Sequence, residues 1–196
     1  MSWKTFACLA ITLASAASGA PPAAEQITAP AVPAGLEVLG PFKPFLKAHA
    51  IGTQNYICAP AANASGFEWL FIGPQATLFD ADLDQSLTHF HSKNAEKANA
   101  IQATWQHSRD SSAVWATRHS GSTDPLYVAP DAIEWLLLDA SGAQYGPTGG
   151  DKLARTAYIQ RINTVGGVKP ATVECTAATL NTRRLVSYEA DYYFYR

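Results

Sequence analysis

The chain has 196 residues, of which 47% are hydrophobic, and it carries a formal net charge of −2. Its lysines and arginines are scattered, so it has neither the basic stripe of a nucleic-acid-binding protein nor the polybasic patch of a membrane-surface protein. We therefore expect no nucleic-acid partner, and no membrane partner once the N-terminal segment has been removed.

Residues 1–20 have the pattern of a signal peptide. Lys4 is the only charged residue before Glu25, and an apolar stretch that ends in small residues covers Phe6 to Ala20. A basic start, an apolar core and A-x-A-type sites are typical of a secretory signal, and the stretch is shorter than the roughly 20 residues that a membrane-spanning helix needs. The sequence thus predicts a secreted protein that is extracellular or at the cell surface.

Residues 21–35 form a Pro/Ala-rich leader with four prolines and no apolar period. We expect this leader to be extended, either as a propeptide or as a strap lying on the domain that follows. From residue 36 to residue 196, short aromatic and β-branched segments alternate with Gly/Pro turns. The pattern predicts a single, mainly β domain: an antiparallel β-sandwich or barrel with long loops and one or two short helical turns, the best of them at residues 92–101.

Two cysteines, Cys58 and Cys175, remain after the signal peptide, which contains Cys8. An even number of cysteines in an exported chain favours a structural disulfide. The chain-entropy model values a bridge across so long a loop at about 4–5 kcal/mol. The sequence Asn63-Ala64-Ser65 also marks Asn63 as an N-glycosylation site in a eukaryotic host.

Several sequence blocks follow one another in order through nearly the whole mature chain: Gly52–Pro60, Trp69 with Gly73–Asp80, His89-Phe90, Trp105 with Asp110–Ser112, Ala132–Leu138, Ile159–Gly167, Cys175 and Tyr188–Arg196. Together they resemble the secreted domain of unknown function 3455 family, which is found in fungi and bacteria. The chain departs from this pattern at Ser111, where many members carry Gly, and at Glu134, where many carry Pro.

The resemblance implies no established activity. Some fungal members are labelled malate dehydrogenase, but a dinucleotide-binding fold needs a Gly-rich turn between a strand and a helix in a repeating βαβ pattern. The segment GPTGG at residues 146–150 has no such context, and we interpret it as a flexible turn. We therefore predict no nicotinamide-dependent activity and no cofactor, with a bound metal ion as the alternative.

The metal alternative depends on Thr88-His89-Phe90-His91. Residues i and i+2 of a strand share a face, so His89 and His91 would present two imidazoles side by side. With a third ligand from His107, His119 or Asp110, the set could bind zinc or copper. The simpler interpretation is that these are polar histidines around a loop and that His89 is a core residue. His89, His107 and Asp110 are also the candidates for catalysis.

The segment from His107 to Ser112 contains the three residue types of Ser/His/Asp hydrolysis. It has no G-x-S-x-G elbow, and adjacent residues on a strand point to opposite faces. An Asp-Ser-Ser turn that holds its own backbone is therefore the favoured interpretation.

Glu189 and Asp191 lie two residues apart in a predicted strand and would share a face. They could form the carboxylate pair of a glycoside hydrolase. Alternatively, one of them pairs with Arg161 or Arg184.

Trp105, Tyr193 and Tyr195 are candidates for stacking against a sugar ring. Residues 192–195 alternate between the two faces of a strand, and an exposed face would suit contact with carbohydrate or a cell-wall polymer. The sequence thus favours an extracellular binding or interaction protein without catalytic activity. The alternative is a small extracellular enzyme, a metal-assisted hydrolase that uses the His89/His91/Asp110 region.

Overall fold

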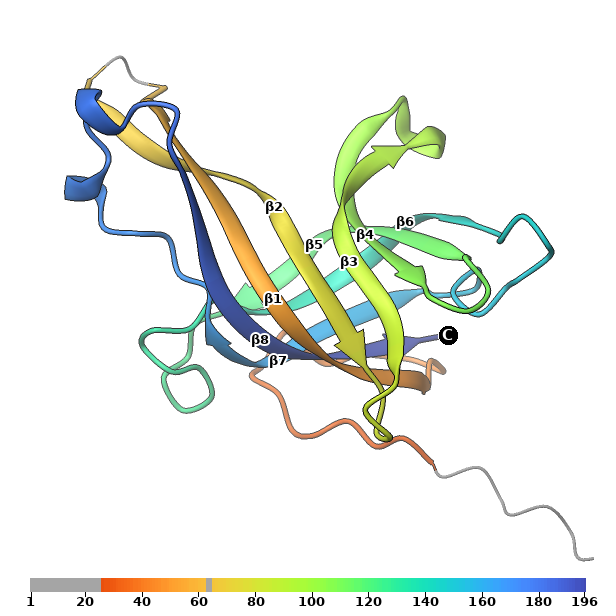
Figure 1. Cartoon of the computed structure of the whole chain (residues 1–196). Coiled ribbons are helices and arrows are strands. Elements are labelled where there is room, and N and C mark those ends of the chain that lie inside the picture. The colour runs from red at the N-terminus through yellow and green to blue at the C-terminus, as the bar shows by residue number, and fades with distance from the viewer. Residues whose placement is uncertain (1–25, 63–64) are drawn as a thin grey trace, which may run out of the picture.

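The computed structural model describes residues 26–62 and 65–196. Within them the chain forms one closed antiparallel barrel, in which each strand pairs with its neighbours in sequence and the last strand pairs with the first (Figure 1). The strands are β1 (Pro44–Pro60), β2 (Phe67–Phe79), β3 (Gln85–Asn94), β4 (Ala100–His107), β5 (Ala113–Ser122), β6 (Trp135–Gln144), β7 (Tyr158–Gly166) and β8 (Arg183–Tyr195). Three short 3-10 turns accompany them: η1 (Ala95–Lys97), η2 (Thr172–Glu174) and η3 (Ala177–Thr179). No helix in the described ranges is long and apolar enough to cross a membrane.

The predicted mainly β class is confirmed, and of the two architectures left open the barrel is correct and the sandwich is wrong. The physical reason is the pairing of β1 with β8 along most of their length, from Pro44 opposite Tyr195 to Ile57 opposite Arg183. This pairing satisfies the backbone groups that a sandwich would leave free at its sheet edges. The helical turn expected at residues 92–101 is only η1, because β3 extends to the residue before it and β4 begins at Ala100.

The C-terminal part of β8 is buried on both of its faces. Ala190, Tyr192 and Phe194 point into the barrel and belong to its inner apolar cluster. Tyr193 and Tyr195 point outward, but they too are buried, in a second cluster outside the barrel. The alternation expected for a strand is therefore present, while neither face of this part of β8 is left to solvent.

The cover over the outer face of β8 is the N-terminal segment 26–42, which we call the strap (Figure 1, orange). It contributes apolar side chains to the outer cluster: Ile27, Ala29, Val32, Leu36, Val38 and Phe42. Gln160 Nε2 of β7 donates a hydrogen bond to Leu36 O at 2.6 Å, which fixes the middle of the strap. The described part of the predicted leader, residues 26–35, therefore contacts the domain, whereas the predicted signal peptide lies outside the described residues.

The predicted disulfide is confirmed. Cys58 near the end of β1 is bonded to Cys175, which directly follows η2, across a sequence separation of 117 residues. Both cysteines are buried in a small cluster with Tyr56 and Trp69. The bridge thus ties the long connection between β7 and β8 to β1 at one end of the barrel.

The barrel splits on one side, between β2 and β3. These strands pair only from Gln75 opposite Phe90 to Phe79 opposite Gln85, and beyond Gln75 they diverge (Figure 1). The divergence begins at Gly73-Pro74, where proline has no N–H to donate and the glycine has a φ of 133°. A Gly-Pro pair commonly ends a strand, but β2 continues through this one, because its pairing with β1 continues on both sides.

Candidate functional site in the barrel lumen

A cavity of about 180 Å³ lies in the lumen of the barrel. All eight strands contribute to its wall, which is lined by Gln54, Phe71, Pro74, His89, His91, Ala103, Trp105, Ala116, Arg118, Leu136, Leu138, Arg161 and Tyr192. The wall combines apolar side chains with a few polar groups. This composition is typical of a small-molecule site, in which a few polar groups orient a mostly apolar ligand.

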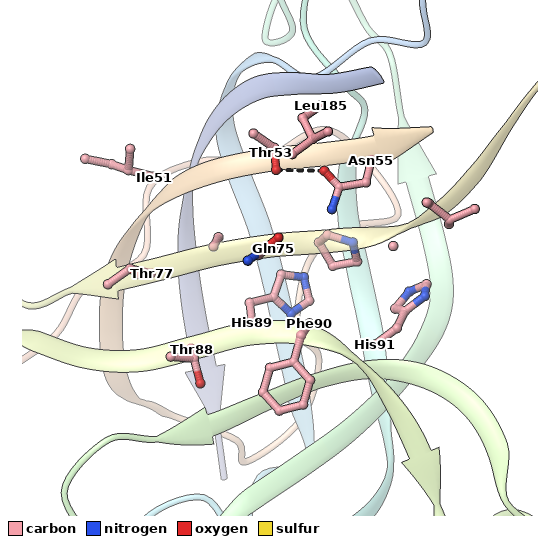
Figure 2. Close-up of a pocket in the computed structure, with 14 residues that line it drawn as sticks. Ile51, Thr53, Asn55, Gln75, Thr77, Thr88, His89, Phe90, His91 and Leu185 are labelled. Atoms are coloured by element: carbon pink, nitrogen blue, oxygen red, sulfur yellow. Dashed lines mark hydrogen bonds between the residues drawn. The ribbon is translucent and has the colours of Figure 1, made fainter. Parts of the chain in front are cut away.

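The lumen opens beside the split between β2 and β3. A wider hollow of about 850 Å³ on the outside of β1, β2 and β3 shares Pro74, His89 and His91 with the lumen wall. Figure 2 shows this hollow, with both imidazoles projecting from β3 beside Gln75 of β2. The two spaces therefore meet at the place where strand pairing ends, which provides a path from the surface to the lumen.

Three buried N–H groups of the lumen wall have no hydrogen-bond partner in the described protein. They are Gln54 Nε2 of β1, Trp105 Nε1 of β4 and Arg161 Nε of β7. Gln54 and Trp105 are only 3% and 1% exposed. A buried donor without an acceptor costs about 1–3 kcal/mol, so three of them in one cavity are a concentrated cost to stability. Such groups are available to the acceptor atoms of a ligand.

Arg161 places a positive charge in this wall. Its Nη2 donates to the backbone oxygen of Glu134 at 2.9 Å, and no carboxylate of the described residues pairs with it. Burial raises the pKa of Tyr192, and the nearby Arg161 charge opposes that rise. The same charge acts on Tyr56 and Tyr188, whose pKa values burial also raises. The guanidinium therefore sits among the inward-facing aromatic residues of the barrel.

His89 is a neutral residue of the lumen. Its Nδ1 lies 2.8 Å from Thr104 O, and since a carbonyl can only accept, Nδ1 carries the proton and Nε2 holds the lone pair. The ring stacks on Trp105 with centroids 4.1 Å apart and planes 9° from parallel. Burial, with the charge of Arg161 as a further cause, lowers the pKa of His89 to about 3. The imidazole thus remains uncharged throughout the physiological pH range.

His91 shares the lumen face with His89, as the i, i+2 spacing predicts, but stands nearer to the opening. Its ring meets that of Phe71 edge to face at 5.6 Å, and burial lowers its pKa. A Cβ on Gly73 would lie 2.9 Å from His91 Nδ1. Glycine at this position therefore leaves room for the imidazole at the split.

The structure does not bring Asp110 or His107 to this cavity. His107 Nδ1 and Asp110 Oδ1 are 3.0 Å apart, and Asp110 also accepts hydrogen bonds from Ser112 N, Ser112 Oγ and Lys152 N. Burial alone would raise the pKa of Asp110, but these hydrogen bonds lower it to about 2. The Asp-Ser-Ser turn holds its own backbone and fastens the loop before residue 153. The GPTGG segment packs here too, since a Cβ on Gly150 would lie 2.3 Å from Asp110 O.

The residues proposed as metal ligands do not converge. His119 lies 2.9 Å from Asp139 Oδ2 at the surface, whereas His89 and His91 face the lumen. Among residues 26–62 and 65–196, no group of three or more His, Cys, Asp or Glu side chains could hold a metal ion. The described residues thus offer no ligand set for the zinc or copper considered above.

Glu189 and Asp191 share the outer face of β8, as expected for residues two apart. Their partner is His49 of β1, with Nε2 3.4 Å from Glu189 Oε2 and Nδ1 2.9 Å from Asp191 Oδ1. Lys47 adds a further ion pair to Asp191 at 3.6 Å. The carboxylates are therefore part of a cross-strand charge cluster, and neither is paired with Arg161 or Arg184.

The three rings considered for sugar stacking are all buried. Trp105 lies in the lumen, 1% exposed, while Tyr193 and Tyr195 lie under the strap at 3% and 5%. The hydroxyl of Tyr195 also donates to Gln160 Oε1. None of these rings forms part of an open surface. Asn63, the predicted glycosylation site, lies outside the described residues.

Gln54, Arg118 and Arg161 are site residues that the sequence did not single out. Their spacing gives a signal for two of them. Gln54 is two and four residues from the buried Tyr56 and Cys58 and shares their face of β1, and Arg161 is two residues from the buried Ile159 and shares its face of β7. Arg118 lies at the rim of the lumen, where its Nη2 pairs with Glu134 Oε2 at 2.9 Å. Parity alone could not say which face of each strand is the inside of the barrel.

Fold and cavity together define the protein as a closed eight-stranded antiparallel barrel with a lumen large enough for a small ligand. Residues 40–196 match the family described as Protein of unknown function (DUF3455), and the chain belongs to this family. No curated protein and no solved structure matches the chain.

Proposed function

We propose that this protein is a secreted binding protein that holds one small organic molecule in the lumen of its barrel. The observation that carries the proposal is the convergence of three buried, unpaired N–H groups on one cavity, those of Gln54, Trp105 and Arg161. A barrel of eight strands is just wide enough either to be filled by its side chains or to hold one small ligand. Donors without acceptors support the second case.

The size of the cavity sets the size of the ligand. An engineered apolar cavity of about 150 Å³ binds benzene, so a lumen of 180 Å³ suits a molecule with a body of that size. Ala103, Ala116, Leu136 and Leu138 provide apolar contact for such a body. The ligand reaches the lumen through the split between β2 and β3, beside His91.

The cavity chemistry favours binding over catalysis. A general base works best when its pKa is near the working pH, and the pKa of His89 is about 3. The hydrogen bond from His89 Nδ1 to Thr104 O and the stack on Trp105 hold this ring in place as part of the wall. Asp110, the carboxylate considered as its catalytic partner, has all its contacts elsewhere.

Export is supported by two features. The first 20 residues have the pattern of a signal peptide, and the two cysteines of the mature chain are bridged. Structural disulfides persist in oxidising compartments and are rare in the cytosol. Sequencing the N-terminus of the protein secreted by its own host tests this part: a mature chain that starts before residue 20, or protein retained in the cell, would contradict it.

Binding is tested with two benzene-sized probes, benzoate and benzyl alcohol, by calorimetric titration and ligand-observed NMR. We expect at least one of them to bind the wild type with a Kd on the order of 0.1–1 mM, as small ligands of this size do. Ala103→Leu fills the lumen and should weaken binding at least tenfold. Ala100→Leu makes the same change at an exposed position of the same strand and should leave binding unchanged.

Two results would refute the proposal. The first is that neither probe binds the folded wild type. The second is that Ala103→Leu and Ala100→Leu bind the probes equally well, since binding would then take place outside the lumen.

A further inference from the structure

We infer that the ligand of the lumen carries one carboxylate, which Arg161 binds, joined to a compact apolar body. This inference rests on the proposed function, because it names the chemical class that the proposed site accepts. Three observations lead to it: the charge of the lumen wall, the kind of polar atoms that lack partners, and the position of the apolar side chains.

The charge of the wall is positive. Arg118 and Arg161 are its charged residues, and no Asp or Glu lines the cavity. Arg118 is neutralised at the rim by Glu134 Oε2, while Arg161 has the backbone oxygen of Glu134 and the side chain of Tyr192 beside it but no carboxylate among the described residues. A partly buried cation without a counter-ion is costly, and an anion in the lumen would remove that cost.

The unpaired polar atoms are donors. The guanidinium of Arg161 and the indole N–H of Trp105 can only donate, and the unpaired atom of Gln54 is its amide nitrogen. Their complement is a group that only accepts. A carboxylate is such a group, and hydrogen bonds from a guanidinium to it are among the strongest in proteins. A neutral hydroxyl offers fewer lone pairs and no charge.

The donors of Arg161 and Trp105 belong to the same part of the lumen. Arg161 and Tyr192 are cross-strand partners in β7 and β8. The Tyr192 ring in turn contacts the Trp105 ring at a centroid distance of 5.5 Å. Both side chains therefore border Tyr192, so we infer that one carboxylate is shared between their N–H groups.

The rest of the wall excludes a second charge. Ala103, Ala116, Leu136 and Leu138 are apolar, and His89 is uncharged with a lone pair on Nε2, which disfavours a second carboxylate. A dicarboxylate in this cavity would leave one charge without a partner. The ligand class is therefore a small monocarboxylic acid with an aromatic or branched aliphatic body of about benzene size.

The test compares benzoate with benzyl alcohol, a neutral probe of nearly the same shape, and with succinate, a dicarboxylate without an apolar body. We expect the wild type to bind benzoate at least tenfold more tightly than either of the others. Arg161→Met should weaken benzoate at least tenfold and change the affinity for benzyl alcohol by less than threefold. Arg109→Met, at an exposed arginine that pairs with Asp84 outside the lumen, is the matched control and should change the benzoate affinity by less than threefold. Arg118→Met tests the rim arginine, which is already paired with Glu134.

A second variant keeps the test valid if Arg161→Met does not fold. Gln54→Met removes one unpaired donor and no charge, and it should weaken benzoate about three- to tenfold while sparing benzyl alcohol. If benzyl alcohol binds the lumen as tightly as benzoate, the carboxylate inference is wrong although the proposed function stands. If neither probe binds, both fail. If Arg118→Met abolishes benzoate binding and Arg161→Met does not, the anion site lies at the rim and the assignment to Arg161 is wrong.

Discussion

Two buried glutamines provide a sharp test of the claim that the lumen is built for a ligand at the expense of stability. Gln54 is 3% exposed and its Nε2 has no partner, whereas Gln160 is 2% exposed and bonded at both ends. Gln160 Nε2 donates to Leu36 O, and Gln160 Oε1 accepts from the Tyr195 hydroxyl. The same substitution, Gln→Met, therefore has opposite consequences at the two positions.

Gln54→Met removes a buried donor that costs about 1–3 kcal/mol and keeps an unbranched side chain of similar length. We expect the free energy of unfolding to rise by about 1 kcal/mol, the low end of that range, because the lumen is open on one side. Gln160→Met leaves Leu36 O and the Tyr195 hydroxyl without partners, so the free energy of unfolding should fall by about 2–3 kcal/mol.

Urea unfolding of the oxidised protein at neutral pH measures both effects. With an m-value of about 2 kcal/mol/M, the midpoint should rise by about 0.5 M for Gln54→Met and fall by 1 M or more for Gln160→Met. Equal m-values are the control that the unfolded states are comparable. A loss of more than about 1 kcal/mol in Gln54→Met would refute the reasoning, because it would mean that the amide is well bonded in the empty barrel.

Three further predictions follow from the same structure. Replacing both Cys58 and Cys175 by Ala should lower the free energy of unfolding by about 2–5 kcal/mol, and thiol titration of the unfolded, unreduced wild type should find no free sulfhydryl. The pKa of His89 is lowered from 6.5 to about 3 in the folded state, so the stability it contributes is complete above pH 6.5 and is lost as the pH falls towards 3. Wild type should therefore lose about 2 kcal/mol more than His89→Phe between pH 7 and pH 5, in parallel urea titrations; equal losses would contradict the buried, neutral state. Ser111 has a φ of 61°, in the left-handed region that favours glycine. Ser111→Gly should therefore raise the free energy of unfolding by up to about 1 kcal/mol, which thermal unfolding would show as a slightly higher melting temperature. A lower melting temperature would show that the serine side chain has a role of its own.

Much of the fold could be predicted, because the signals are local. The aromatic and β-branched segments with their Gly/Pro turns indicated a β domain, and Cys58 and Cys175 were expected to pair with each other, as they do. The i, i+2 spacing of His89 and His91 placed both rings on one face, which is the lumen face. The glycine that many members carry at position 111 also has a local reason, since this residue has a positive φ.

The candidate site could be predicted only in part. The sequence pointed to His89 as a metal ligand or catalytic base and to Trp105 as a stacking surface for a sugar. In the structure the two rings stack on each other inside the barrel. Gln54 and Arg161 stand in strands with clear alternation, yet alternation says only which residues share a face. It does not say that this face surrounds a cavity.

The sequence by itself determined the β class, the disulfide and the sharing of strand faces, because each of these depends on neighbouring residues or on a count. Only the tertiary structure decided which face is inside. The strap buries Tyr193 and Tyr195 on the outer face of β8 as fully as the barrel buries Tyr192 and Phe194 on the inner one, so hydrophobicity could not separate the two. The pairing of β1 with β8, the first and last strands in the sequence, then closed the barrel. One of these faces became the wall of a lumen, and the donors of β1, β4 and β7 came to one cavity.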